Sequence, residues 1–222
     1  MIKARFASRE RLGLTKGEFA ILRRLNTPEK IQAYLDAMPQ NFEIGGETCL
    51  SVREALSQRR ALCIEGAMIA AAALWVHGEP PLLLDLKATQ DYDHIVTLYR
   101  RNGCWGAISK TNHAVLRWRD PIYRNVRELA MTYAHEYNLD YGKKSMVAFS
   151  RPFSLARYAP ARWLITPDDL DWLMDAVDAS PHQPVAPQHA LRRRRRTTRV
   201  ELKSQDVTEW PVPRERRVAP TK

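Results

Sequence analysis

One apolar stretch, Leu62–His77, stands out in the pattern of hydrophobic and polar positions, and Glu65 is its one acidic residue. Its Ala, Leu and Met residues favour a helix, and Gly78 with the prolines that follow marks the end of that helix. A helix that is apolar on every side has to be buried. We therefore expect this helix at the centre of the fold.

Shorter helical segments precede this stretch. Thr27 and Pro28 form a helix start, as N-cap and first helical residue, and apolar residues recur at helical spacing after them. Ser51 caps a second short helix that leads toward the central one. Residues 1–26 form a basic, weakly patterned N-terminal segment, in which one short helix is expected over Lys16–Leu25.

After Pro81 the pattern changes to short apolar, β-branched or aromatic runs. Leu82–Leu86 and His94–Arg100 predict two strands, and Asn102-Gly103 predicts a tight hairpin that returns along Cys104–Ser109. A buried helix followed by hairpin-linked strands predicts an α+β fold, with the central helix packed on an antiparallel sheet.

The pattern downstream is more mixed. We expect a strand over Ala114–Arg119, a helix from Pro121 to about Asn138, and a last short helix that starts at Thr166. Four apolar anchors are expected to pack back onto the domain: Phe153, Leu155, Tyr158 and Trp163. The sequence thus predicts one domain over residues 27–178, and residues 179–222 as a disordered, Arg-rich C-terminal tail.

Composition narrows the class of protein. At 222 residues and 45% hydrophobic content, the chain can build one domain with a real core. It has no run of about 18 apolar residues, and charges occupy the N-terminal positions where a signal peptide is apolar. We therefore expect a cytoplasmic protein without a membrane partner. The three cysteines are widely spaced and predict reduced thiols, with no metal and no cofactor.

The positive charge is concentrated at one end. Residues 191–222 carry +7 of the net charge of +10, and five consecutive arginines, Arg192–Arg196, lie within them. Such a run binds nucleic acid or another polyanion through its phosphate groups. The alternative is a solvated tail without a partner.

Cys63 opens the central helix, where free N–H groups and the helix dipole can lower a thiol pKa and hold an oxyanion. The alternative is an inert core cysteine. The hairpin supplies a partner, because a two-residue loop at Asn102-Gly103 sets Val96 opposite Ser109 and His94 opposite Thr111. The side chains of His94, Ser109 and Thr111 are then expected on one face.

Four segments together resemble the transglutaminase-like superfamily of papain-like thiol enzymes: Arg60-Ala-Leu-Cys63-Ile-Glu-Gly-Ala, His77-Gly78-Glu-Pro-Pro, Asp93-His94-Ile-Val-Thr-Leu-Tyr, and Gly103-Cys-Trp105-Gly-Ala-Ile-Ser109-Lys-Thr111. The resemblance covers roughly residues 45–115. It implies a papain-like core in which Cys63 is the nucleophile, His94 its partner and Trp105 a substrate-binding residue. The family has Asp where this chain has Ser109, so the carboxylate that would stabilise the histidine cation is replaced by a hydroxyl.

The leading hypothesis is thiol-dependent acyl transfer on an amide or ester, with a catalytic set of Cys63, His94 and Ser109 and with hydrolysis favoured over transamidation. Thr111 is a further histidine orienter on the same face, and Asn112 becomes one if the register slips by one residue. Weaker replacements for the missing carboxylate are Asp93 and Asp120. One rival is a degenerate member of the superfamily that binds or scaffolds a partner without turnover. The other is a polyanion-binding or nucleic-acid-associated protein that works through its tail.

Overall fold

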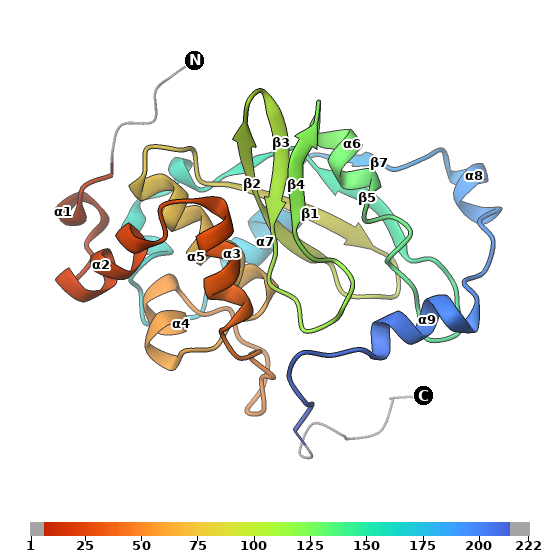
Figure 1. The fold of residues 1–222 in the computed structure, drawn as a ribbon, viewed down its shortest axis with the longest axis horizontal. Coiled ribbons are helices and arrows are strands. Elements are labelled where there is room, and N and C mark those ends of the chain that lie inside the picture. Colours follow the sequence, from red (N-terminus) through yellow and green to blue (C-terminus); the bar gives the residue numbers. More distant parts are fainter. Residues whose placement is uncertain (1–6, 214–222) are drawn as a thin grey trace.

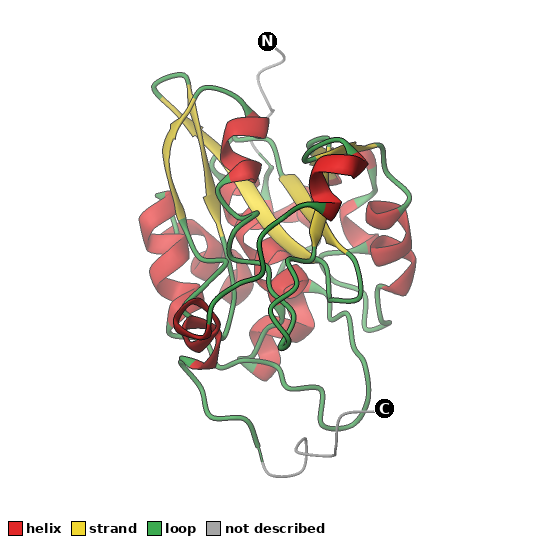
Figure 2. Cartoon of the chain, turned by 90° about the vertical axis from the view of Figure 1, so that its right-hand side faces the viewer, coloured by secondary structure: helices red, strands yellow, loops and turns green. Residues whose placement is uncertain are grey.

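The computed structural model describes residues 7–213, so predictions for residues 1–6 and 214–222 lie outside the described residues. It shows an α+β fold in which a central helix packs on an antiparallel sheet, as predicted (Figure 1). Turned by 90°, the strands are seen with helices on both sides (Figure 2). No helix in the described range is long and apolar enough to cross a membrane.

The helices and strands follow one another along the chain in a mixed order. The helices are α1 (Arg9–Leu12), α2 (Lys16–Arg24), α3 (Pro28–Asp36), α4 (Val52–Gln58), α5 (Cys63–Val76), α6 (Val126–Met131), α7 (Asp171–Asp178), α8 (Gln188–Arg192) and α9 (Arg199–Asp206). The strands are β1 (Leu82–Ala88), β2 (His94–Arg101), β3 (Cys104–Ile108), β4 (Arg119–Tyr123), β5 (Met146–Ser150), β6 (Phe153–Ser154) and β7 (His182–Pro184). Their order in the sheet is β4-β3-β2-β1-β5-β7, with β6 paired to β1.

Helix α5 is enclosed on all sides, as its composition requires. Every residue from Ile64 to Val76 is buried, and the helix packs against α2, α3, α4 and the strands β1 and β2. Figure 1 shows α1–α4 gathered with α5 at one side of the sheet. Apolar burial on this scale is the main stabilising force available to a domain of this size.

Glu65 is the buried carboxylate in the first turn of α5. It accepts hydrogen bonds from the backbone N–H groups of Leu50 and Leu62, at 2.9 and 2.6 Å, and from the side-chain amide of Asn41. Burial raises the pKa of Glu65. This charge therefore has a structural role, because it joins the start of α5 to the loop that precedes α4.

The β2–β3 hairpin has the predicted register. Arg101 pairs with Cys104 and Thr97 with Ile108, so counting outward sets Val96 opposite Ser109. Asn102 and Gly103 both have positive φ, at 49° and 84°, as a tight two-residue hairpin turn requires. The hairpin prediction is confirmed.

The helix predicted from Pro121 to Asn138 is wrong. Pro121 lies in β4 at the edge of the sheet, where a residue without an N–H group is tolerated. Helix α6 begins only after Asn125, whose side chain caps it by accepting from the N–H of Glu128. The strand predicted over Ala114–Arg119 is mostly loop, and β4 begins at its last residue.

The N-terminal segment is part of the domain and not an appendage. Leu12 and Leu22 are completely buried, and α2 packs directly on α5. Residues before the expected domain boundary at residue 27 therefore belong to the core. Helix α5 is apolar on every side, and α2 buries part of its surface.

The C-terminal region also differs from the expected disordered tail. Strand β7 pairs with β5, and helices α8 and α9 follow it. Segment 207–210 then runs antiparallel to residues 112–114, with backbone hydrogen bonds from Ala114 N–H to the Val207 carbonyl and from Glu209 N–H to the Asn112 carbonyl. The polar composition of this region did not predict that it is folded, because much of it is attached to the domain by backbone pairing and not by apolar burial.

Gly66 lies where α5 approaches Lys110, and a Cβ at this position would come within 2.4 Å of the Lys110 Cβ. We expect Gly66→Ala to lower the free energy of unfolding by about 1–3 kcal/mol, although Ala favours a helix by about 1 kcal/mol over Gly. Urea unfolding would measure this. Gly45→Ala is the matched control, because no atom lies within 4 Å of its Cβ position. Equal stability of the two variants would contradict the close packing.

Candidate catalytic site

Cys63 is the first residue of α5 and is half-buried, whereas Ile64 and the residues after it are buried. Burial raises the pKa of the Cys63 thiol to about 11, and the nearby backbone N–H groups of Ile95 and Ile64 lower it by less. The expected lowering of the thiol pKa by the helix start is therefore outweighed. The resting group is a neutral thiol.

His94 is the first residue of β2 and is only 6% exposed. Its Nε2 lies 2.8 Å from the Oγ of Ser109, which lies 2.6 Å from the backbone carbonyl oxygen of Leu116. The carbonyl can only accept, so the Ser109 hydroxyl proton is donated to it. Ser109 Oγ must then accept from His94, which places the proton of the neutral ring on Nε2.

This arrangement leaves His94 Nδ1 as an unprotonated nitrogen without a hydrogen-bond partner in residues 7–213. Burial lowers the pKa of His94 to about 4, and the Leu116 carbonyl opposes this by less. The ring is therefore neutral near pH 7. Its unprotonated nitrogen is Nδ1, and with so low a pKa the ring does not hold Cys63 as a preformed thiolate.

Leu116 has a backbone conformation that brings its carbonyl to Ser109. Its φ is 59°, in the left-handed region that costs a bulky residue free energy. The conformation is held from the other side, since the Leu116 N–H donates to Glu136 Oε2 at 2.6 Å and Arg119 pairs with Glu136. No sequence signal points to Leu116, because it accepts the hydrogen bond of Ser109 through its backbone carbonyl.

Gln32 of α3 fixes the backbone of Ser109. Its side-chain amide donates to the Ser109 carbonyl at 2.8 Å and its oxygen accepts from the Ser109 N–H at 2.9 Å. The side chain is almost fully buried. Gln32 is thus a positioning residue that the helical pattern of α3 did not reveal.

The structure brings together His94 and Ser109, and it places Cys63 beside the backbone of Ile95, one residue along β2. Thr111 accepts from the N–H of His113, and Asn112 exchanges two hydrogen bonds with the backbone of Trp210. Neither is the orienter of His94.

The remaining candidates are also engaged elsewhere. Asp93 accepts from the N–H of Ala88, and Asp120 accepts from the Trp118 indole. Trp105 lies on β3 with the Arg100 guanidinium 5.4 Å above its ring. Cys49 is buried, and its burial raises its pKa further than that of Cys63.

The chain matches no protein-family model and none of the curated proteins.

The hydrogen-bond chain from Leu116 to His94 predicts one tautomer. We expect ¹⁵N NMR of the imidazoles to show His94 neutral with its proton on Nε2, and to keep it so until about pH 4. The unfolded chain takes up this proton near pH 6.5, so His94 makes the fold less stable as pH falls from 6.5 to about 4. Ser109→Ala should shift the ring signals, whereas Thr111→Ala should not. Protonation of His94 near pH 6.5 in the folded protein would contradict this arrangement.

Proposed function

We propose that the protein carries out thiol-dependent acyl transfer on an amide or ester, with Cys63 as nucleophile and His94 as general base and acid. The observation that carries the proposal is the hydrogen-bond chain from the Leu116 carbonyl through Ser109 to His94 Nε2. It leaves an unprotonated Nδ1 on the first residue of β2, and the half-buried Cys63 opens α5 beside the backbone of the next residue, Ile95.

The proposed first step begins from the neutral pair. His94 Nδ1 takes the thiol proton as Cys63 Sγ bonds to the substrate carbonyl carbon, and the carbonyl electron pair moves onto oxygen. N–H groups at the start of α5, including that of Cys63, are the donors for this oxyanion. Collapse breaks the bond to the leaving amine or alcohol, which takes the proton from Nδ1.

The second step releases the acyl group. Water attacks the thioester as His94 Nδ1 takes its proton, and the Cys63 sulfur then leaves and is reprotonated. An amine acceptor in place of water would give transamidation. Hydrolysis is the favoured outcome, because water needs no second binding site.

Ser109 makes this a slow enzyme. In serine enzymes the loss of the third-residue carboxylate costs about 10⁴ in kcat, and a hydroxyl bonded to a carbonyl likewise gives the imidazolium no full negative charge. The order of a helix-opening cysteine and a strand-opening histidine supports a papain-like, transglutaminase-like core. The free state of Cys49, Cys63 and Cys104 supports a reducing, cytoplasmic setting.

Acylation of Cys63 tests the proposal. Incubation with p-nitrophenyl acetate should give a burst of nitrophenol and a single acetyl adduct, which peptide mass spectrometry would locate at Cys63. Cys63→Ala should abolish both, whereas Cys104→Ala, which also removes a half-buried cysteine, should retain them. His94→Gln should slow acylation by about 10²-fold or more. A folded protein that gives no adduct at Cys63 would favour the rival, a binding domain without turnover.

We propose polyanion binding as a second function, carried by a basic pocket at α8. The pocket has a volume of about 220 Å³ and is lined by Leu191 and six cationic residues: Lys143, Lys144, Arg192, Arg194, Arg195 and Arg196. A concave site with this lining attracts phosphate groups and releases counterions when it binds them.

The cationic side chains of this basic pocket differ in whether they already have hydrogen-bond or ion-pair partners. Arg194 donates to the backbone carbonyls of Leu191, Met146 and Lys144, so it builds the wall of the pocket. Arg195 pairs with Glu201, the one carboxylate within ion-pair distance of these cations across residues 7–213. Arg192 and Arg196 are exposed and have no ion-pair partner in that range, which leaves them to contact phosphate.

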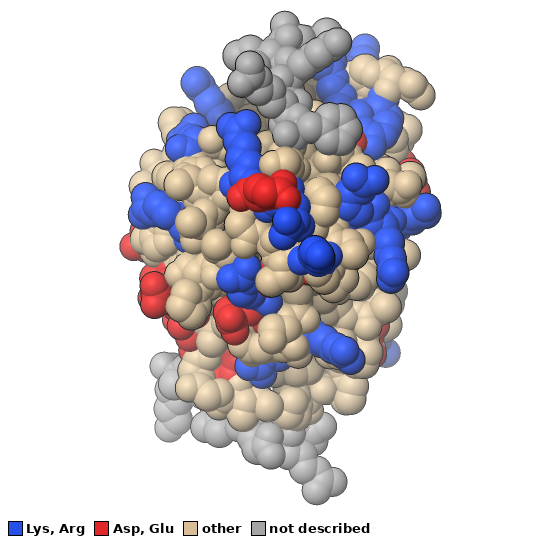
Figure 3. Space-filling model, turned by 90° about the vertical axis from the view of Figure 1, so that its left-hand side faces the viewer, with Lys and Arg blue, Asp and Glu red and all other residues tan. Residues whose placement is uncertain are grey.

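Salt-dependent binding of a fluorescent single-stranded DNA tests this second function. Replacing Arg192 and Arg196 by Gln should weaken binding and lower the slope of log K against log salt by about 0.7 for each phosphate group that is no longer neutralised. The control is Arg23→Gln with Arg24→Gln on α2, an equal change of charge on the opposite side of the fold, where basic side chains are scattered (Figure 3). Equal effects of the two double variants would show that net charge alone drives binding.

A further inference from the structure

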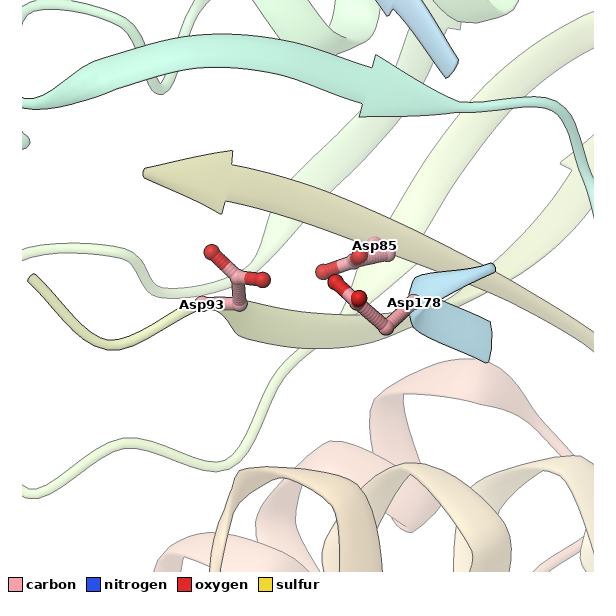
Figure 4. Close-up of side chains that lie close together, drawn as sticks. All are labelled: Asp85, Asp93 and Asp178. Carbon is pink, nitrogen blue, oxygen red and sulfur yellow. The ribbon is translucent and has the colours of Figure 1, made fainter. Parts of the chain in front are cut away.

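Three aspartates that are distant in the sequence converge beside the β1–β2 connection. Asp85 lies on β1, Asp93 immediately precedes β2, and Asp178 ends α7. One ligand oxygen from each lies within 4.8 Å of the other two. Figure 4 shows the three carboxylates pointing toward one another from these different elements.

A second observation concerns Asp85 alone. The residue is only 1% exposed, and its buried Oδ1 accepts no hydrogen bond from residues 7–213. The other oxygen, Oδ2, lies 2.9 Å from Nε2 of His182. An unpartnered buried carboxylate oxygen is costly and rare in folded proteins, and a bound ion is one of its recognised causes.

The charge balance of the cluster is negative. Burial, together with the neighbouring Asp93, raises the pKa of Asp85 to about 6. Lys87 pairs with Asp178 and lies 3.8 Å from Asp93, so one ammonium faces three carboxylates.

We propose that Asp85, Asp93 and Asp178 bind a hard divalent cation, with His182 holding Asp85 in position. Three oxygens within 4.8 Å of one another can share one cation, because Ca²⁺ binds oxygen at about 2.3–2.6 Å and any two of its ligands then lie at most about 5.2 Å apart. A hydrogen-bonded histidine behind a ligating carboxylate is a common orienting device. The Lys87 ammonium is the competing occupant.

This proposal goes beyond acyl transfer, and its test needs no substrate. The full chain, stripped with EDTA and dialysed, is titrated separately with CaCl₂, MgCl₂ and MnCl₂ by calorimetry. At least one salt should give saturable, single-site binding. Asp178→Asn should weaken it by about tenfold or more, since Asp178 is exposed and its replacement leaves the core intact. Asp175→Asn, an exposed aspartate on the same helix, should bind as the wild type does.

Lys87→Met separates a cation site from a merely structural ion-pair network. It removes the competing ammonium, so the cation should bind several-fold more tightly. Two results would overturn the proposal: no saturable binding of any of the three salts up to about 10 mM, or equal affinity in Asp178→Asn and Asp175→Asn. Weaker binding in Lys87→Met would count against it as well.

Discussion

An α-helix without a polar face has to be surrounded, and this constraint organises the molecule. The sheet covers one side of α5, and α2, α3 and α4 cover others. The one end that stays partly open carries Cys63. Enclosure also demands close approach, which is why the position facing Lys110 is a glycine. The thiol is thus held by a rigid element whose position the whole core determines.

Burial also decides the protonation states in the candidate site. A histidine almost closed off from solvent, whose hydrogen-bond chain ends on a neutral carbonyl, has little to stabilise its cation. The thiol likewise loses more from burial than it gains from the nearby N–H groups. Proton transfer in the proposed reaction therefore has to accompany bond formation and cannot precede it. In this respect the proposed reaction resembles that of a serine–histidine pair.

Local signals predicted the parts of the fold that they control. The composition of α5 and the turn residues Asn102 and Gly103 were sufficient to place the central helix, the hairpin and the contact between His94 and Ser109. The contact could be predicted because the position of one turn determines which residues pair along both strands of a hairpin. The folded structure of the C-terminal region, with α8, α9 and segment 207–210, could not be predicted in this way, since it depends on pairing with distant residues.

The missed site residues share one cause. Gln32 acts on the backbone of Ser109, and Leu116 acts through its own carbonyl, so neither leaves a motif in the sequence. Asp85 and Asp178 carry no motif, Asp93 was considered only as a partner of His94, and the three meet because β1, β2 and α7 are brought together. Such chemistry is specified by tertiary geometry, and single-sequence patterns do not record it.

Segment 207–210 has a consequence for the order of folding. Asn112, in the loop between Ser109 and Leu116, exchanges its two side-chain hydrogen bonds with Trp210, 98 residues further along the chain. During synthesis the core around α5 can form well before these residues emerge. The loop that supplies the Leu116 carbonyl is therefore locked only after Trp210 has been synthesised. A nascent chain would have a folded core before it has a fully ordered site.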